Sequence, residues 1–425
     1  MPLPEPPQSR LPPVHLGPAD AGGRRPLHAL AVARTEVADA LEATWARGAA
    51  ATVLPEDGPA TERQALLELL RPAAVVSRGP SGTLARTPLA GAVPVDGDVA
   101  VLVTTSGSTG VRKAVALSIT ALDASVAASL ARLDARPGER WGLALPTHHV
   151  AGLSVLLRAR ALGRRASVAA DTTAVADLEV DHVALVPTQL ADLLDLGADL
   201  RRFRTILLGG ARPDRELLAR AAAAGARIVV SYGMTETVGG CVYDGVPLDG
   251  VEVAVTGAGR IRVRGPVLLH GYRTRGEDGR IRDVPGVDAD GWFTTSDVGE
   301  LHDGELTVTG RSDEVLVSGG VNVPLAAVRA AIASHPGVTQ VAVTAIPDAR
   351  FGEVPAAVVV AADPAVPPTL EALRTHVKDR APAAYAPRRL VVVAALPRDG
   401  LGKVPRAALD RLLSSGGGAA GDPSR

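Results

Sequence analysis

The sequence predicts an α/β protein: a large N-terminal domain with doubly wound sheets and a small β region, and a small α+β domain at the C-terminus. Three textures along the chain lead to this fold class. Short apolar runs alternate with stretches of helical spacing, short strands with Gly-Asp turns then run from 247 to 310, and a mixture of helices and strands follows Arg311. Strands that alternate with helices are typical of parallel sheets covered by helices.

The elements expected in the large domain begin with helical spacing at 34–48 and 61–71. Apolar runs indicate buried parallel strands at 99–104, 142–145, 182–187, 205–208 and 227–231, separated by helices at 118–133, 189–196 and 214–224. In the small domain we expect helices at 323–333 and 369–380 and strands at 338–346, 354–361 and 389–394. The resulting organisation is a loose Pro-rich arm at 1–25, the large domain at 26–312, the small domain at 313–412 and a disordered tail at 413–425.

The composition excludes several classes of protein. Of the 425 residues, 46% are apolar and 21% are charged, which is ordinary for a globular protein and not for a disordered or fibrous one. The net charge of −1 gives no reason to expect nucleic acid or an anionic membrane as a partner. No apolar run reaches the roughly 18–20 residues that span a bilayer. We therefore expect a cytoplasmic protein without a signal peptide, and a homodimer fits its size.

The single cysteine, Cys241, excludes an intramolecular disulfide and argues against a cysteine-based zinc site. Lysine is also scarce, because it occurs only at Lys113, Lys378 and Lys403 among 45 basic residues. Lysine is a compact charge that can meet a phosphate oxygen end-on, which the broad guanidinium of arginine does not do. A lysine in a Gly-rich loop of this chain is therefore a candidate functional residue.

A Gly/Ser/Thr loop is the strongest local signal. An apolar strand leads into it, a helix is expected from about Ser118, and the loop residues are Thr105, Ser106, Gly107, Ser108, Thr109 and Gly110, with Lys113 close behind. Glycines let backbone N–H groups turn towards an anion, and the hydroxyls add donors. The pattern predicts a phosphate site that is not a Walker A loop, because Ala114 follows the lysine where Ser or Thr is required.

Five motifs, in order along the chain, resemble those of the adenylate-forming superfamily of acyl- and aryl-CoA synthetases, adenylation domains and luciferases. They are the Gly/Ser/Thr loop, SYGMTET at 231–237, GWFTTSD at 291–297, TGRSD at 309–313 with SGG at 318–320, and PRDGLGKVPR at 397–406. Ser296 departs from the family pattern, in which glycine is usual. The motifs extend from about residue 100 to about residue 410.

The resemblance implies a two-step reaction that uses ATP, Mg²⁺ and coenzyme A. A carboxylate attacks the α-phosphorus of ATP and releases pyrophosphate, and the thiol then attacks the acyl-adenylate. The first step brings anionic groups together and needs charge neutralisation. By resemblance, the loop and Lys113 hold the β- and γ-phosphates. Glu236 would bind Mg²⁺, and Thr235 would contact the α-phosphate and the incoming carboxylate.

The resemblance also implies the nucleoside contacts. Asp297 has carboxylate oxygens suited to the two ribose hydroxyls, and Arg311 would bond the ribose or a phosphate. Two short segments complete the ATP site: Gly209, Gly210 and Ala211, whose backbone would flank adenine, and Ser231, Tyr232 and Gly233, with the Tyr232 ring stacked on the base.

The small domain is expected to be mobile, again by resemblance. Lys403 would bridge the α-phosphate and the attacking carboxylate during adenylation. Asp313 matches the hinge position of the family, about which the small domain rotates. That rotation would remove Lys403 and bring Ser318, Gly319 and Gly320 to a tunnel for the pantetheine arm of coenzyme A.

Three further stretches bear on the acid. PTHHVAGL at 146–153, LVPTQL at 185–190 and GGCVYDGVPLDG at 239–250, with a short N-terminal part, resemble the short o-succinylbenzoate–CoA ligases of menaquinone biosynthesis. This acid keeps an aryl carboxylate, which needs a polar or cationic partner if it is buried. His149, Thr188 and Arg212 are the candidates, and the sequence does not choose among them. Cys241 is interpreted as a packing residue.

Two alternatives stay open. The first keeps the chemistry and changes the acid: another acyl- or aryl-CoA ligase, or a stand-alone adenylation enzyme. The second is a homologue that has lost catalysis and only binds nucleotide. The joint presence of Lys403, Glu236 and Asp297 argues against the second alternative, since a chain almost without lysine has kept one in this loop.

Overall fold

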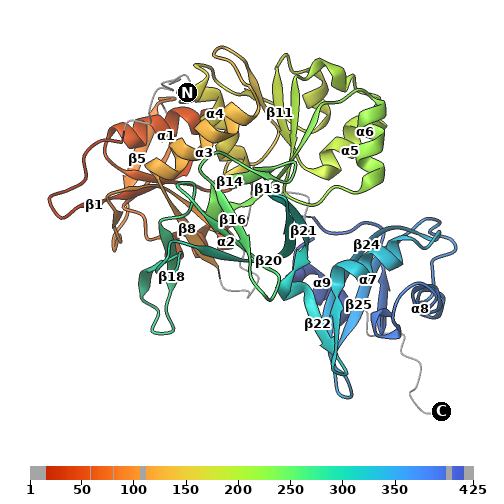
Figure 1. Ribbon diagram of the computed structural model, residues 1–425. Coiled ribbons are helices and arrows are strands. Elements are labelled where there is room, and N and C mark those ends of the chain that lie inside the picture. Colours follow the sequence, from red (N-terminus) through yellow and green to blue (C-terminus); the bar gives the residue numbers. More distant parts are fainter. Residues whose placement is uncertain (1–15, 58, 80, 106–111, 399–403, 416–425) are drawn as a thin grey trace. The chain divides into compact units, whose positions relative to one another are not determined.

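The computed structural model describes residues 16–57, 59–79, 81–105, 112–398 and 404–415 (Figure 1). The chain divides into two compact units. The larger comprises Met1–Ala254, Arg262–Thr294 and Leu301–Thr307, and the smaller comprises Val255–Ile261, Thr295–Glu300 and Val308–Arg425. The domain boundary expected at 312/313 stays a prediction.

An eight-stranded sheet belongs to the larger unit. In spatial order it contains β19 (Ile281–Pro285), β18 (Gly271–Arg275), β8 (Lys113–Ser118), β7 (Val99–Thr105), β3 (Ala50–Val53), β2 (Leu27–Ala31), β4 (Ala74–Arg78) and β5 (Leu84–Pro88). The strands β7, β3, β2 and β4 are parallel, and the others are added antiparallel. Helices α1 (Val37–Ala46) and α2 (Ala60–Leu70) connect the first parallel strands.

A seven-stranded sheet forms the second layered part of the larger unit. Its order is β10 (Ser167–Val168), β9 (Trp141–Leu143), β11 (His182–Leu185), β12 (Thr205–Leu208), β13 (Ile228–Met234), β14 (Gly239–Tyr243) and β15 (Val246–Pro247). The strands from β10 to β13 are parallel, as expected, and β14 and β15 are antiparallel.

Helices cover both faces of this second sheet. On one face, α5 (Pro187–Asp195) and α6 (Arg215–Ala223) lie side by side (Figure 1) and share a buried core with Val183 and Ile206 of the strands. Residues alternate between the faces of a strand, so His182 and Trp141 face the other way. There Trp141 stacks on His182 and lies against Arg158 of α4 (Val150–Ala161), and α4 lies beside α3 (Ile119–Arg132). This arrangement is the doubly wound architecture that the sequence predicts.

The small β region expected at 247–310 is a four-stranded sheet, except that β18 and β19 of the same segment belong to the eight-stranded sheet. Its four strands are β16 (Glu252–Val255), β17 (Arg260–Arg264), β20 (Phe293–His302) and β21 (Glu305–Arg311), in that spatial order. The division into two units passes through these strands. A separate two-stranded ribbon pairs β1 (Arg24–Arg25) with β6 (Val95–Asp96).

The smaller unit contains a five-stranded sheet between helices. β23 (Val321–Pro324), β22 (Val315–Ser318), β25 (Gly352–Ala361) and β24 (Val338–Asp348) follow one another, and β26 (Arg389–Val392) pairs with β25. Ala357 and Val359 of β25 pack against α7 (Leu325–Ala333) and α8 (Leu370–Lys378). Ala356 and Val358 face α9 (Arg406–Ser415). Burial on both faces explains the continuous apolar run of this central strand.

Three local features differ from the expectations. β8 follows the Gly/Ser/Thr loop and pairs antiparallel with β7, so Lys113 begins a strand that the sequence did not predict, whereas the helix starts at Ile119, as expected. In addition, the segment 17–25, expected to be part of a loose arm, is attached to the larger unit. Gly17 N donates to Trp45 O (2.9 Å), and the buried Arg25 donates to Gly97 O (2.6 Å). The tail expected at 413–425 also differs, because residues 413–415 belong to α9 and Leu413 is buried. Residues 1–15 of the arm and 416–425 of the tail lie outside the described residues.

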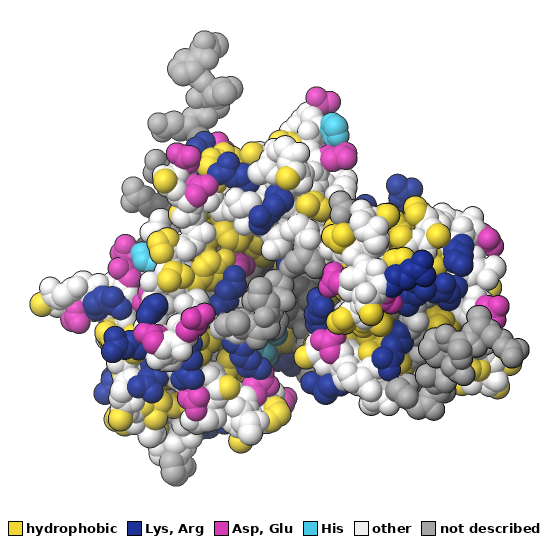
Figure 2. All heavy atoms as spheres, turned by 90° about the horizontal axis from the view of Figure 1, so that it is seen from below, with side chains coloured by type: hydrophobic (Ala, Val, Ile, Leu, Met, Phe, Trp, Pro, Cys, Tyr) yellow, Lys and Arg dark blue, Asp and Glu magenta, His cyan; other side chains and the backbone are white. Residues whose placement is uncertain are grey.

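The surface shows no extended field of one sign on the face of the larger unit in Figure 2, where acidic, basic and hydrophobic side chains are interspersed. None of the helices in the described ranges is long and apolar enough to cross a membrane.

Candidate active site

Three side chains meet in the larger unit at the start of β8. Lys113 Nζ lies 3.2 Å from Glu236 Oε1, and Tyr272 Oη donates to the same carboxylate oxygen at 3.0 Å. The Lys113 ammonium also lies over the Tyr272 ring, 3.8 Å from its centroid. The structure thus joins two residues predicted to act on ATP with a third, Tyr272, to which the sequence assigned no role.

This cluster is largely enclosed. The Glu236 side chain is 12% exposed and the Lys113 side chain 32%. Burial, reinforced by the charge and hydrogen bond of Glu236, raises the pKa of Tyr272 well above its ordinary value. The phenol therefore keeps its proton at neutral pH and remains a hydrogen-bond donor to the carboxylate.

The turn that carries Glu236 is closed tightly. β13 and β14 form a hairpin around a short 3₁₀ turn, Thr235–Thr237, which also carries Thr235. A Cβ on Gly233 would lie 1.9 Å from Gly239 O, so only glycine fits there. Thr237 Oγ1 accepts from Met234 N at 3.0 Å and lies 2.6 Å from Gly239 O. The motif SYGMTET therefore owes part of its composition to the shape of the turn.

The two segments predicted to hold adenine are neighbours. Gly209, Gly210 and Ala211 follow β12, and Ser231, Tyr232 and Gly233 lie on the adjacent strand β13. A Cβ on Gly209 would lie 3.6 Å from Ser231 Cβ, in ordinary contact. Carboxyl ends of parallel strands are where open α/β sheets bind nucleotides.

Asp297 and Arg311 form an ion pair between β20 and β21 of the smaller unit. Arg311 Nη1 lies 3.2 Å from Asp297 Oδ1, and the Asp297 side chain is 13% exposed. Thr295 Oγ1 accepts from Asp297 N at 3.0 Å, which fixes the backbone before the carboxylate. The structure thus brings together Asp297, predicted to bind the ribose, and Arg311, predicted to bond the ribose or a phosphate.

The remaining predicted residues of the smaller unit lie near its first hairpin. Asp313 belongs to the short turn Ser312–Glu314 that leads from β21 into β22. Ser318 ends β22, and Gly319 and Gly320, both with positive φ, make the turn to β23. Such a two-glycine turn is the natural connection of a tight hairpin. Lys403 lies outside the described residues, as do the loop residues Ser106, Gly107, Ser108, Thr109 and Gly110, whereas Thr105 ends β7.

The three candidates for the second carboxylate come from different elements. His149 is the N-cap of α4, with the His148 ring 4.2 Å away. Thr188 is in the first turn of α5 and lines a hollow of about 330 Å³ between α5 and α6, and Arg212 is exposed after β12. The start of α4 is held close to the preceding segment, because a Cβ on Gly152 would lie 2.3 Å from Pro146 O.

Arg158 is a second residue that sequence reasoning missed. It lies in α4, is only 3% exposed, and donates to Ser129 Oγ (2.8 Å) and Tyr243 Oη (3.2 Å). Its guanidinium also lies 5.3 Å from the Trp141 ring. Within the described ranges no carboxylate pairs with it. The available signal was an arginine inside the apolar helical run VAGLSVLLRARA.

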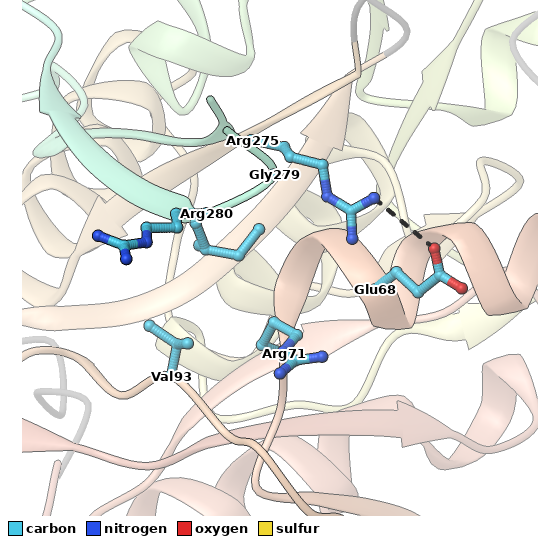
Figure 3. A pocket seen from close by; sticks show the side chains of 7 residues that line it. Glu68, Arg71, Val93, Arg275, Gly279 and Arg280 are labelled. Carbon is cyan, nitrogen blue, oxygen red and sulfur yellow. Dashed lines mark ion pairs between the residues drawn. The ribbon is translucent and has the colours of Figure 1, made fainter. Parts of the chain in front are cut away.

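A hollow of about 410 Å³ lies elsewhere on the larger unit (Figure 3). Its charged lining is Glu68, Arg71, Arg275 and Arg280. Arg275 points to Glu68, 3.9 Å away, whereas Arg280 points in another direction (Figure 3). None of the predicted site residues lines this hollow.

The cluster around Glu236 fits a magnesium ion. Mg²⁺ in nucleotide sites takes one or two carboxylates together with phosphate oxygens and water. Lys113 and Tyr272 both contact Oε1, and among the described residues Glu236 Oε2 has no hydrogen-bond partner. No group of three or more acidic, His or Cys side chains that could hold a metal by itself occurs in the described part of the chain. A single carboxylate suits an ion that arrives with ATP.

The Cys241 thiol is expected to be unreactive in the native protein. Burial raises its pKa to about 12, so the reactive thiolate is almost absent near pH 8. With a disulfide reagent such as dithionitrobenzoate at pH 8, we expect no colour from the native protein and one thiol per chain after denaturation in guanidinium. Rapid native reaction would contradict the interpretation of Cys241 as a packing residue.

The chain belongs to the AMP-binding enzyme family. Residues 30–273 match the AMP-binding enzyme domain, and residues 327–403 match the AMP-binding enzyme C-terminal domain. This confirms the resemblance to adenylate-forming enzymes seen in the motifs.

Its curated relatives include proteins named as 2-succinylbenzoate–CoA ligases. The chain is 43% identical over 337 residues to a probable 2-succinylbenzoate–CoA ligase of Mycobacterium tuberculosis (strain ATCC 25618 / H37Rv), covering 75% of this chain and 85% of that protein. It is 35% identical over 264 residues to the 2-succinylbenzoate–CoA ligase of Escherichia coli (strain K12), covering 60% of this chain and 57% of that protein.

Solved structures confirm the fold class. The o-succinylbenzoate CoA synthetase of Bacillus subtilis in complex with the acyl-adenylate intermediate OSB-AMP is similar with a TM-score of 0.76 and 26% identity, over 91% of this chain and 89% of that one. The B. subtilis enzyme in complex with ATP and magnesium ion gives a TM-score of 0.77 and 26% identity, over 92% and 90%.

Proposed function

We propose that this protein is an ATP-dependent ligase that activates 2-succinylbenzoate as an acyl-adenylate and transfers the acyl group to coenzyme A. The observation that carries the proposal is the 43% identity to a ligase named for this acid, over 85% of that protein's length. The Lys113–Glu236 cluster supports it, because it places a cation and a metal-binding carboxylate at one site. The conversion serves menaquinone biosynthesis, as the sequence motifs suggest.

Charge neutralisation is the main task of the adenylation site. Glu236 would hold Mg²⁺, which neutralises phosphate charge when it is bound. Lys113 and the Gly/Ser/Thr loop would bind the β- and γ-phosphates, and Thr235 would orient the attacking carboxylate. Lys403 would bridge that carboxylate and the α-phosphate. Asp297 and Arg311 would fix the ribose, Asp297 as the acceptor for its hydroxyls.

The direct test is pyrophosphate release from ATP with Mg²⁺. 2-Succinylbenzoate is compared with benzoate, a medium-chain fatty acid and several amino acids, each with and without coenzyme A. The proposal expects release with 2-succinylbenzoate and a thioester only when coenzyme A is present. Release with another acid alone would keep the chemistry and exclude this substrate.

We further propose that Arg158 meets the aryl carboxylate of the substrate. A buried guanidinium that hydrogen-bonds only neutral hydroxyls keeps an uncompensated positive charge. A carboxylate reaching it would complete the ion pair. Arg158 lies on α4, the helix that begins at the His149 motif, and Ser154 of the same helix donates to Val238 O beside the Glu236 turn at 3.1 Å.

Arg158→Met is expected to abolish the preference for the second carboxylate. The wild type should favour 2-succinylbenzoate over 3-benzoylpropionate, which lacks only that group, by about a hundredfold in kcat/KM, as expected for a charge-assisted hydrogen-bonded pair. The variant should favour neither acid by more than a few-fold. Arg160→Gln is the matched control, because Arg160 lies on the same helix as Arg158 and pairs with Glu42 of α1. An unchanged preference in Arg158→Met would exclude this role.

Rotation of the smaller unit about Asp313 stays part of the proposal. Asp313→Pro fixes φ at a position that has to change conformation between the two steps. Thioester formation should then fall at least about tenfold more than adenylation, measured as thioester yield against pyrophosphate exchange. Equal losses in the two reactions would argue against a hinge at this residue.

The cytoplasmic location and the homodimer expected from the sequence are further proposals. Light scattering coupled to size-exclusion chromatography tests the dimer, and a monomer mass at micromolar concentration would exclude it.

A further inference from the structure

β18 presents different side chains to its two faces. Tyr272 lies on the face that holds Glu236 and Lys113. Arg273, the next residue, lies on the opposite face and is fully buried against Asp283 and the carbonyls of Leu70 and Val93. The strand therefore connects the candidate active site with the packing behind it.

The position of the Tyr272 ring is set by the backbone around it. Tyr272 pairs with Val115 of β8, two residues after Lys113 on the same strand. Just before β18, His270 N donates to Ala116 O at 2.8 Å and Leu269 N donates to Glu236 O at 2.9 Å. The same segment thus holds both the backbone of Glu236 and the ring that contacts its side chain.

Tyr272 makes two separable contacts. Its hydroxyl donates to Glu236 Oε1, and its ring face lies against the Lys113 ammonium. The hydroxyl donates to Glu236 Oε1, the same oxygen that the Lys113 ammonium contacts. Glu236 Oε2 therefore has no partner among the described residues. Phenylalanine would keep the ring contact and remove the hydroxyl, so the two contacts can be tested one at a time.

We propose that Tyr272 is a positioning residue for the nucleotide site. Its hydroxyl keeps the Glu236 carboxylate turned so that Oε2 is presented to magnesium, and its ring keeps Lys113 at the site when the ammonium leaves the carboxylate for phosphate. The inference rests on the proposed function only in taking Glu236 as the magnesium ligand and Lys113 as a phosphate ligand.

The two contacts have different consequences for binding. Without the hydroxyl, the carboxylate turns more freely, so magnesium-dependent binding weakens and magnesium-free binding does not. Without the ring, the ammonium loses a cation–π contact and is held less well, so ATP binds less tightly in either condition. Neither change involves the acid, so the KM for 2-succinylbenzoate stays the same.

The experiment uses calorimetric titration of ATP into the full-length protein, with and without Mg²⁺, for the wild type, Tyr272→Phe and Tyr272→Leu. We expect Tyr272→Phe to weaken binding about tenfold with Mg²⁺, as for the loss of a hydrogen bond to a charged group, and less than twofold without it. We expect Tyr272→Leu to weaken binding about fivefold further in both conditions. Tyr385→Phe, in the smaller unit, is the control and should bind like the wild type.

Other results overturn the inference. If Tyr272→Phe binds ATP in the presence of Mg²⁺ within twofold of the wild-type affinity, the Tyr272 hydroxyl does not position Glu236. Equal weakening with and without Mg²⁺ would mean that Tyr272 contacts the nucleotide itself. If wild-type binding does not depend on Mg²⁺, Glu236 is not presented to the ion.

Because these titrations contain no acid, their outcome is independent of the substrate. A wild type that binds ATP with Mg²⁺ but does not act on 2-succinylbenzoate would refute the proposed function alone. If Tyr272→Leu does not fold, as judged by its melting curve, the more conservative Tyr272→Phe still decides the role of the hydroxyl.

Discussion

Glu236→Gln is expected to lower 2-succinylbenzoate-dependent pyrophosphate release by about a thousandfold, the size of effect seen when one preorganised electrostatic group is removed from a site that stabilises developing charge. The amide keeps the shape of the side chain and can still accept from Tyr272 Oη, now 3.0 Å from Oε1. It lacks the charge that magnesium requires. The loss should therefore appear in turnover and in the Mg²⁺ dependence of ATP binding.

A second readout separates this effect from misfolding. In the wild type, Lys113 is neutralised by Glu236 at 3.2 Å. In Glu236→Gln the ammonium is no longer paired with a carboxylate there, so ATP without Mg²⁺ should bind at least as tightly as it does to the wild type. Glu277→Gln, at an exposed position after β18, is the matched control and should keep full activity. Activity of Glu236→Gln within threefold of the wild type would contradict the assignment of the magnesium ligand.

Arg273→Met is expected to destabilise the larger unit by about 3 kcal/mol or more, because it leaves three carbonyls without their buried donor at roughly 1 kcal/mol or more each. All five N–H groups of this guanidinium are used. Nε and Nη2 donate to Asp283 at 2.9 and 3.0 Å, Nη1 donates to Leu70 O and Val93 O, and Nη2 donates to Pro94 O. The side chain thereby joins β18, the end of α2 and the segment before β6.

Thermal melting gives the measurement. For a unit of this size, a loss of 3 kcal/mol corresponds to a fall of about 5 °C in Tm. Arg273→Lys should recover only part of it, since an ammonium has three donors. Arg275→Met is the matched control, because Arg275 lies two residues further along β18, on the same face of the strand. It removes only an ion pair to Glu68 at 3.9 Å (Figure 3), with both side chains about half exposed, and should change Tm little. A melting point of Arg273→Met within 2 °C of the wild type would show that this network contributes nothing to stability.

Much of the fold could be predicted from hydrophobic patterns. The parallel strands at β11 and β12 and the helices α3 and α6 were recognisable because each is a continuous apolar or amphipathic stretch bounded by turn residues. The strands β2, β3 and β4 were not recognised. β2 (LHALA) and β3 (AATV) contain two alanines each, so they lack the β-branched runs by which a buried strand is identified, whereas β4 (AVVSR) has such a run in Val75 and Val76 and was overlooked.

β8 illustrates a different difficulty. The stretch KAVALS lies between a Gly-rich loop and a helix, where a phosphate loop commonly leads directly into a helix. Its six residues pair along β7 through a register that includes Thr105 with Lys113. This pairing places Lys113 at the end of a strand. That Lys113 lies in a strand can be recognised only from the tertiary structure, in which β8 lies beside β7.

The residues of the candidate site also fall into those that the sequence indicated and those that only the structure revealed. The family and the ATP chemistry could be predicted, and Glu236 and Lys113 could be singled out as candidates, because the motifs are short and contiguous. Tyr272 and Arg158 could not, because each acts through residues far away in sequence. Tyr272 contacts Glu236 across 36 positions, and Arg158 contacts Tyr243 across 85.

The sequence by itself determined the α/β class, the adenylate-forming motifs and the residue types that the chemistry requires, since these depend on local spacing. Only the tertiary structure decided which side chains share an oxygen, which cation is buried among neutral hydroxyls and which arginine holds β18 in place. Those properties arise when strands from distant parts of the chain become neighbours in a sheet, and burial then makes an unpaired charge or an unsatisfied carbonyl costly.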